Sequence, residues 1–210
     1  MQSEPMVHVI DDDEAARESL AFLIDCAGLR VRSYESALAF LDSVPAMEHG
    51  CIVTDVRMPG MSGVELIARL KALQVDDPVI VMTGHADVPM AINAMKQGVS
   101  DFIEKPFSDE TILSAIRSAL ARHKDAAEEN AERSRLRERI AALSQREREV
   151  LDGLVAGKAN KVIAFDLAIS ARTVEVYRAN LMTKMQAGSL SELVRMTMLA
   201  GLPGTAQGKG

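Results

Sequence analysis

The chain has 210 residues, 48% of them hydrophobic and 26% charged, with a formal net charge of −6. This composition excludes a disordered, collagen-like or membrane-embedded protein, and the length allows one large domain or two small ones. The longest apolar runs, such as Val79 to Met82, are far shorter than a membrane span of roughly 18 residues, and residues 1–5 lack the features of a secretory signal. We therefore expect a cytoplasmic protein that does not contact the membrane.

Charge is distributed unevenly along the chain. Residues 1–121 hold 9 basic and 19 acidic side chains, a net charge of −10. Residues 122–142 hold 6 and 5, and residues 143–210 hold 9 and 6, a net charge of +3. The asymmetry predicts two modules with different partners, of which only the second could approach a polyanion without repulsion.

Short apolar runs alternate with amphipathic stretches in the first module. The predicted strands are Val7–Ile10, Leu29–Ser33, Cys51–Thr54, Val79–Thr83 and Asp101–Glu104. The predicted helices are Glu14–Ala27, Ser36–Leu41, Val64–Leu73, Pro89–Gln97 and Asp109–Arg122. Five such repeats predict an α/β domain over residues 1–121, a doubly wound (βα)5 fold with helices on both faces of a parallel sheet.

A helical linker is predicted over residues 122–142. Residues 109–152 contain neither glycine nor proline, and 11 of the 21 linker residues are charged. The sequence leaves open whether this helix is continuous or broken. Leu136, Ile140 and Leu143 form a narrow apolar stripe that allows a partner helix, but the charged surface favours a solvated tether.

The last part of the chain is predicted to be all-α. Ser144 and Glu147 form a capping box that opens a helix over Gln145–Ala156. Three further helices are predicted over Asn160–Leu167, Ala171–Met185 and Ser191–Leu199. The second and third of the four helices, with the short turn between them and Ser170 as a cap, match a helix-turn-helix arrangement. We predict this domain over residues 143–203, followed by a flexible tail over residues 204–210.

Acidic residues follow two of the predicted strands. Asp11 and Asp12 come directly after the first strand, and Asp55 follows the third. If these strands are adjacent, their carboxyl ends bring the three carboxylates together, and Mg²⁺ would relieve the repulsion among them. Two other strand ends supply the hydroxyl of Thr83 and the amine of Lys105. Together these groups predict a phosphoryl-transfer site with a carboxylate nucleophile.

The first module resembles the receiver domains of two-component response regulators. The resemblance rests on V-H-V-I-D-D-D at 7–13, T-D-V-R-M-P-G-M-S-G at 54–63, M-T-G-H at 82–85 and D-F-I-E-K-P-F at 101–107. It implies that Asp55 accepts a phosphoryl group from the histidine of a sensor kinase. It also implies a Mg²⁺ site made by Asp11, Asp12, Asp55 and the carbonyl oxygen of Arg57.

The same resemblance assigns a switch. Thr83 and Lys105 would contact the phosphoryl oxygens, and Phe102 would be the aromatic side chain whose rotamer follows Thr83. Burial preference alone gives Phe102 an alternative role as a plain core aromatic. An enzymatic alternative for the whole module is a haloacid-dehalogenase-like phosphatase, but Arg57 stands where that family needs an acid. We therefore expect no enzyme beyond Mg²⁺-dependent self-phosphorylation and autodephosphorylation.

One face of the predicted helix Ala171–Met185 is suited to DNA. Apolar residues at 174, 177, 181 and 185 form an inward stripe, and the opposite face is mostly polar. Arginine and asparagine read guanine and adenine edges, whereas lysine contacts phosphates. An ordinary solvated face is the alternative. The residues assigned to nucleic-acid binding are Lys161, Arg172, Thr173, Glu175, Val176, Arg178, Asn180 and Lys184.

The second module resembles LuxR-type output domains, and both together resemble the FixJ-like nitrogen-fixation regulators. The motifs are L-S-Q-R-E-R-E-V-L at 143–151, N-K-V-I-A at 160–164 and I-S-A-R-T-V-E-V-Y-R-A-N-L-M-T-K-M at 169–185. The resemblance implies a DNA-binding transcription regulator that forms a homodimer when phosphorylated. Its implied partners are a cognate sensor histidine kinase and double-stranded promoter DNA, with RNA polymerase as a further candidate. The alternative is a constitutive DNA-binding regulator whose receiver binds metal but is never phosphorylated.

Overall fold

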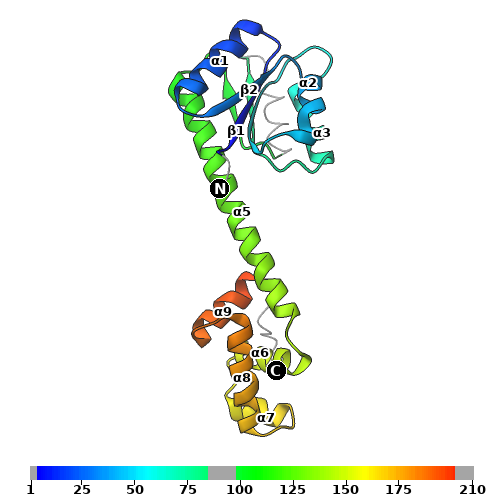
Figure 1. The fold of residues 1–210 in the computed structure, drawn as a ribbon, viewed down its shortest axis with the longest axis vertical. Coiled ribbons are helices and arrows are strands. Elements are labelled where there is room, and N and C mark those ends of the chain that lie inside the picture. The colour runs from blue at the N-terminus through cyan, green and yellow to red at the C-terminus, as the bar shows by residue number, and fades with distance from the viewer. Residues whose placement is uncertain (1–3, 85–97, 202–210) are drawn as a thin grey trace. The chain divides into compact units, whose positions relative to one another are not determined.

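The computed structural model describes residues 4–84 and 98–201 and contains two compact units, Met1–Asp125 and Ala126–Gly210 (Figure 1). The predicted helix Pro89–Gln97 lies outside the described residues. Within the described part of the chain, no helix is both long and apolar enough to cross a membrane.

The first unit is a five-stranded parallel sheet with helices on both faces. The strands are β1 Met6–Ile10, β2 Arg30–Tyr34, β3 Gly50–Asp55, β4 Val79–Thr83 and β5 Asp101–Glu104, in the order β2-β1-β3-β4-β5. The helices are α1 Glu14–Cys26, α2 Ala37–Ser43, a short 3₁₀ turn Val44–Ala46, α3 Gly63–Ala72 and the start of α5, Asp109–Ala141. This confirms the predicted doubly wound fold.

Two apolar clusters hold the sheet between its helices. Because strand side chains alternate between faces, neighbouring residues of β1 enter different clusters. One cluster joins the sheet to α1 and α5 and includes Val7, Val9, Val53, Ile80, Met82, Leu20, Ile24, Ile112 and Ile116. The other joins it to α2 and α3 and includes Ile10, Ile52, Val81, Phe40, Leu66, Ile67 and Leu70. Burial on both faces explains why the central strands are almost wholly apolar in sequence.

The strand order determines where a site can form. The chain moves from β1 outward to β2, and then returns past β1 to β3 and continues in the opposite direction. At such a reversal the connections leave the sheet on opposite faces, which opens a crevice at the carboxyl ends of the two central strands. Asp11 and Asp55 lie at the ends of these two strands.

The second unit is helical. It consists of the end of α5 with α6 Gln145–Val155, α7 Asn160–Asp166, α8 Ala171–Met185 and α9 Leu190–Leu199. The predicted capping box is present at Ser144 and Glu147, and the Ser170 hydroxyl accepts a hydrogen bond from the Thr173 amide at 3.0 Å. The two helices of the predicted helix-turn-helix are therefore α7 and α8.

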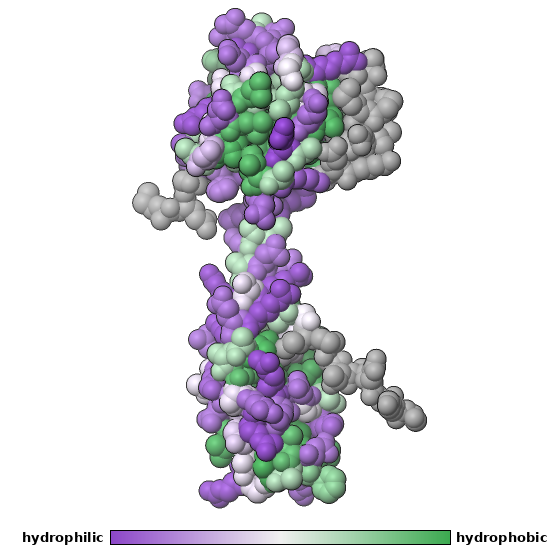
Figure 2. All heavy atoms as spheres, turned by 90° about the vertical axis from the view of Figure 1, so that its right-hand side faces the viewer, coloured by the Kyte–Doolittle hydropathy of each residue, from purple (hydrophilic) through white to green (hydrophobic). Residues whose placement is uncertain are grey.

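The linker is one continuous helix, and its last turns are not a solvated tether. Leu136, Ile140 and Leu143 are 3%, 6% and 7% exposed and belong to the core of the second unit, together with residues of α6, α7, α8 and α9. The charged residues 124–135 are exposed, and Figure 2 shows a largely hydrophilic surface along them. The prediction of a solvated linker thus holds for 124–135 and is wrong for the apolar stripe, so the second unit begins before residue 143.

We expect Ile140→Ala to lower the free energy of unfolding of the second unit by about 2–5 kcal/mol, because it leaves a cavity in a packed core. Glu132→Ala, on an exposed part of the same helix, should change it by less than about 0.5 kcal/mol. The chain has two tyrosines and no tryptophan, so in a Tyr34→Phe background the fluorescence of Tyr177 reports urea unfolding of this unit alone. Equal stability of the two variants would contradict the assignment of residue 140 to the core.

Candidate functional site

The loop after β1 carries three consecutive aspartates, of which Asp11 is buried and Asp12 and Asp13 are exposed. Asp11 is 3% exposed, and its Oδ1 accepts a hydrogen bond from the Asp13 amide at 3.0 Å. Asp13 caps α1 by accepting from the Ala16 amide at 2.9 Å, as its position before the helix predicts. Arg17 reaches back from α1 and donates to the Asp11 carbonyl at 2.8 Å. The loop is therefore fastened at both ends, while Asp12 is exposed.

Asp55 ends β3, next to the end of β1 in the sheet. Its Oδ2 accepts a hydrogen bond from the Arg57 amide at 2.6 Å, which holds the carboxylate at the end of the strand. A glycine at 63 lets the start of α3 approach, because a Cβ atom there would lie 2.3 Å from the Asp55 carbonyl oxygen. This close approach also allows the Gly63 amide to donate a hydrogen bond to the Val56 carbonyl at 3.0 Å. The phosphoacceptor candidate therefore sits in a tightly defined turn.

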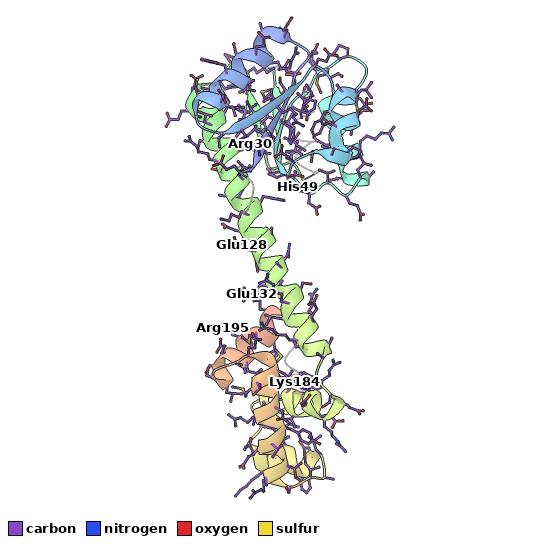
Figure 3. All side chains as sticks on the ribbon, viewed as in Figure 1. Arg30, His49, Glu128, Glu132, Lys184 and Arg195 are labelled. Atoms are coloured by element: carbon purple, nitrogen blue, oxygen red, sulfur yellow. The ribbon has the colours of Figure 1, made fainter. Side chains whose placement is uncertain are left out.

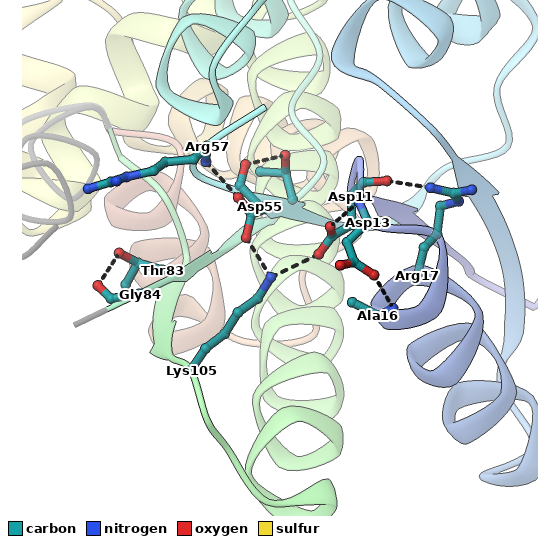
Figure 4. Close-up of polar contacts among 10 residues, drawn as sticks. Asp11, Asp13, Ala16, Arg17, Asp55, Arg57, Thr83, Gly84 and Lys105 are labelled. Atoms are coloured by element: carbon teal, nitrogen blue, oxygen red, sulfur yellow. Dashed lines mark hydrogen bonds and ion pairs between the residues drawn. The ribbon is translucent and has the colours of Figure 1, made fainter. Parts of the chain in front are cut away.

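Lys105 connects the two carboxylates. Its Nζ lies 2.9 Å from Asp11 Oδ2 and 2.5 Å from Asp55 Oδ1, although the three residues come from three different strand ends (Figure 4). Burial lowers the pKa of the Lys105 ammonium, but the hydrogen bonds to Asp55 and Asp11 outweigh it, so this pKa lies above its ordinary value. The ammonium is thus charged at neutral pH and placed to balance negative charge at Asp55.

The two residues assigned to the switch lie on β4 and β5. Thr83 is 3% exposed, and its hydroxyl donates to the Gly84 carbonyl at 3.2 Å (Figure 4). Phe102 is 43% exposed, so the alternative role as a plain core aromatic is wrong. The alternation along β5 explains this exposure, because Ile103 is the residue that enters the core.

The acidic pocket has the donor chemistry of a magnesium site. Its ligands would be the hard oxygens of carboxylates and one carbonyl, which Mg²⁺ prefers. Two of the three assigned carboxylates converge on one ammonium, and this ammonium supplies the positive charge that balances them. In the described residues, the side-chain positions themselves do not gather three His, Cys, Asp or Glu ligands around one point. The oxygen ligands of the pocket therefore suit Mg²⁺ chemically. Asp12 is exposed to solvent in this structure.

The second unit presents the predicted helix face. Val174, Leu181 and Met185 are buried in its core, and Tyr177 packs partly against it. On the opposite side, Arg172, Glu175, Val176 and Asn180 are exposed, as is Lys161 on α7. Arg178 and Thr173 are half-buried, and the Thr173 hydroxyl lies 2.7 Å from Ser170 Oγ at the start of the helix. Most of the assigned residues therefore form a surface that could face DNA.

Lys184 differs from the other assigned residues. Its Nζ lies 2.7 Å from Glu147 Oε2, in an ion pair within the second unit. The sequence does not reveal this contact, because the two residues are 37 positions apart and a capping box alone accounts for Glu147.

Two family patterns cover most of the chain. Residues 7–117 match the response regulator receiver domain, and residues 141–197 match the luxR family of bacterial regulatory proteins. The transcriptional regulatory protein FixJ of Azorhizobium caulinodans is 60% identical over 196 residues, which are 93% of each chain. The response regulator protein TmoT of Ectopseudomonas mendocina is 42% identical over 194 residues, 92% of this chain and 88% of that one.

Solved structures agree with these families. The full-length FixJ of B. japonicum is 53% identical, has a TM-score of 0.62 and covers 95% of this chain and 98% of its own. The response regulator StyR is 38% identical, with a TM-score of 0.80, and covers 93% and 99%. The likeness therefore extends over both units.

We expect Lys105→Met to lower the free energy of unfolding of the first unit by about 1–3 kcal/mol in buffer free of divalent cations, because two carboxylates would lose their shared donor and face each other. Adding Asp11→Asn should recover most of this loss by removing one of the like charges. Urea unfolding followed by Tyr34 fluorescence in a Tyr177→Phe background measures both effects. A double variant less stable than Lys105→Met would contradict the role of Lys105 as the shared counter-charge.

Proposed function

The chain belongs to the FixJ-like response regulators, which join a receiver domain to a LuxR-type DNA-binding domain, and we propose that phosphorylation of Asp55 controls its binding to promoter DNA. The observation that carries this proposal is the ammonium of Lys105 between the carboxylates of Asp11 and Asp55, at the point where the strand order reverses. The phosphodonor would be the phosphohistidine of a cognate sensor kinase.

The chemistry is a phosphoryl transfer to a carboxylate. An oxygen of Asp55 attacks the phosphorus, an O–P bond forms, and the N–P bond to the histidine breaks with its electron pair remaining on the imidazole nitrogen. The product is an acyl phosphate with nearly two negative charges. The Arg57 amide and the Lys105 ammonium already hold the Asp55 carboxylate, so the attacking group is oriented before the donor arrives.

Magnesium fits the same pocket. Receiver domains generally bind Mg²⁺ at their acidic pocket. In this chain the ligands would be Asp11, Asp12, Asp55 and the carbonyl oxygen of Arg57. When bound, the ion neutralises charge on the transferring phosphoryl group. The protein's own contribution is to keep the Asp11 loop in place through the contacts of Asp13 and Arg17.

The proposed switch begins at Thr83. Its hydroxyl now donates to a backbone carbonyl, and a phosphoryl group on Asp55 would offer it a stronger, charged acceptor. Movement of Thr83 toward the phosphate opens space beside Phe102, whose ring is free to turn inward because it is 43% exposed rather than packed in the core. This rearrangement reshapes the surface at β5 and promotes a homodimer.

The proposed output is binding of the dimer to paired half-sites in double-stranded DNA. Arg172 and Asn180 would read base edges from α8, and Lys161 would contact the phosphate backbone. Glu175 opposes DNA unless it accepts a hydrogen bond from cytosine. RNA polymerase is a further proposed partner at the promoter. A constitutive regulator without phosphorylation is the second candidate, and the first experiment below separates the two.

Asp55→Asn should abolish phosphorylation while leaving the fold intact, because it removes the nucleophile but keeps the side-chain shape. Wild-type protein incubated with Mg²⁺ and acetyl phosphate should gain one phosphate by mass spectrometry and lose it in mild base. Asp13→Asn, which keeps the helix cap beside the pocket and changes neither the acceptor nor an assigned metal ligand, should be labelled like the wild type and serves as the control. Stoichiometric labelling of Asp55→Asn would move the acceptor elsewhere, and absence of labelling in the wild type would favour the constitutive regulator.

Thr83→Ala should still accept phosphate but should dimerise and bind DNA poorly, because the group that follows the phosphate is missing. Sedimentation of the phosphorylated variant against the phosphorylated wild type, at the same concentration, measures the effect. Thr111→Ala, an exposed threonine on α5, is the matched control and should behave as wild type. Full dimer formation by Thr83→Ala would remove Thr83 from the switch.

A further inference from the structure

An ion pair fastens the end of α8 to the start of α6. Lys184 lies in the last turn of α8, and Glu147 lies in the first turn of α6. Their Nζ and Oε2 atoms are 2.7 Å apart. Figure 3 labels Lys184 in the second unit. The pair therefore joins the helix assigned to DNA reading to the first helix that follows the linker.

The acidic partner is the buried one. The side chain of Glu147 is only 5% exposed, and its Oε2 also accepts a hydrogen bond from the Ser144 amide at 2.8 Å. The hydrogen bonds from Lys184 and Ser144 hold the pKa of Glu147 below its ordinary value. At neutral pH the carboxylate is thus ionised and largely withdrawn from water, so it depends on both donors.

The basic partner is committed to this contact. The Lys184 side chain is 45% exposed along its length, but its ammonium is directed at Glu147. Moving the ammonium to a DNA phosphate would leave a buried carboxylate without its charged partner, which is strongly unfavourable. Lys161, by contrast, is exposed on α7, and among the described residues its ammonium has no hydrogen-bond or ion-pair partner.

Other contacts fix the same end of α8. Arg139, from the end of α5, donates to the Met185 carbonyl at 3.2 Å and to the Gln186 side chain at 2.7 Å. The buried Met185 anchors the last turn in the core. The ion pair adds a directional, charged constraint to this packing, and so limits rotation of α8 about its own axis.

We infer that Lys184 is a positioning residue for DNA recognition: through Glu147 it holds α8 in the rotation that turns Arg172 and Asn180 outward, and it does not contact the DNA backbone. The inference rests on the proposed function, because it assumes that α8 reads DNA. It also separates two roles that the sequence assigned together. A lysine on phosphate strengthens binding to every DNA, whereas a positioning lysine strengthens binding only where bases are read.

The test compares Lys184→Met with Lys161→Met in the full-length, phosphorylated protein. The probes are a duplex selected by the wild-type protein from a random-sequence pool and an unrelated duplex of equal length. Lys184→Met should weaken binding to the selected duplex on the order of tenfold, the low end of losing one base contact. It should leave binding to the unrelated duplex and the salt dependence unchanged. Lys161→Met should weaken binding to both and lower the salt slope by about one phosphate contact.

Glu147→Gln gives opposite expectations for the two roles. Glutamine also serves in a capping box, so the variant keeps the cap at Ser144 and removes only the charge. If Lys184 positions the helix, Glu147→Gln loses affinity for the selected duplex as Lys184→Met does. If Lys184 contacts the DNA backbone, Glu147→Gln frees its ammonium, and the variant binds both duplexes at least as well as the wild type does. Lys184→Arg, which keeps the ion pair, should restore the preference for the selected duplex.

The outcomes are distinguishable. A reduced salt slope for Lys184→Met equal to that of Lys161→Met, or unchanged specific binding by Glu147→Gln, overturns the positioning role but leaves the proposed function standing. Failure of the wild type to enrich any sequence overturns DNA reading by α8, and this inference with it. If Lys184→Met does not fold, Glu147→Gln still decides between the two roles.

Discussion

The first unit depends on one electrostatic constraint, the need to hold two carboxylates side by side at the end of a parallel sheet. Asp11 and Asp55 reach the same point because β1 and β3 are neighbours in register. Lys105 makes this arrangement stable by placing one ammonium against both. The same contacts suit the pocket to a further negative group, because the proposed phosphoryl group on Asp55 would meet a positive charge already in place. The ammonium of Lys105 therefore both stabilises the fold and suits Asp55 to the proposed phosphoryl transfer.

Much of this site could be predicted from the sequence, because the carboxyl ends of all strands in a parallel sheet lie at the same edge. β1, β3 and β4 are short, mostly apolar runs, and the residue at or just after the end of a strand lies at the sheet's carboxyl edge. That rule places Asp11, Asp55, Thr83 and Lys105 at one edge without any knowledge of distances. It does not give hydrogen-bond partners. The reach of Arg17 to the Asp11 carbonyl depends on how α1 leaves the loop, which periodicity does not specify.

The second unit was less predictable, because its contacts join helices that are far apart in the sequence. The sequence shows the apolar stripe of Leu136 and Ile140, but a narrow stripe on a charged helix predicts a solvated helix. Only the positions of the other helices show that the stripe is buried. Lys184 was assigned to DNA by its position on the helix, since a sequence shows which face a residue occupies and not what already contacts it. The partner, Glu147, was accounted for by its capping box alone.

The energetics of the proposed switch explain why such a protein would act as a dimer. Moving a two-state equilibrium from 1:99 to 99:1 requires about 5.5 kcal/mol of differential stabilisation. A hydrogen bond from Thr83 to a charged phosphoryl oxygen contributes about 1.5–3 kcal/mol, which is too little within one chain. Two chains that must associate before paired half-sites are bound combine two such contributions, about 3–6 kcal/mol, in a single binding event. In the proposed switch, coupling through association would therefore let a weak local change at Thr83 control DNA binding almost completely.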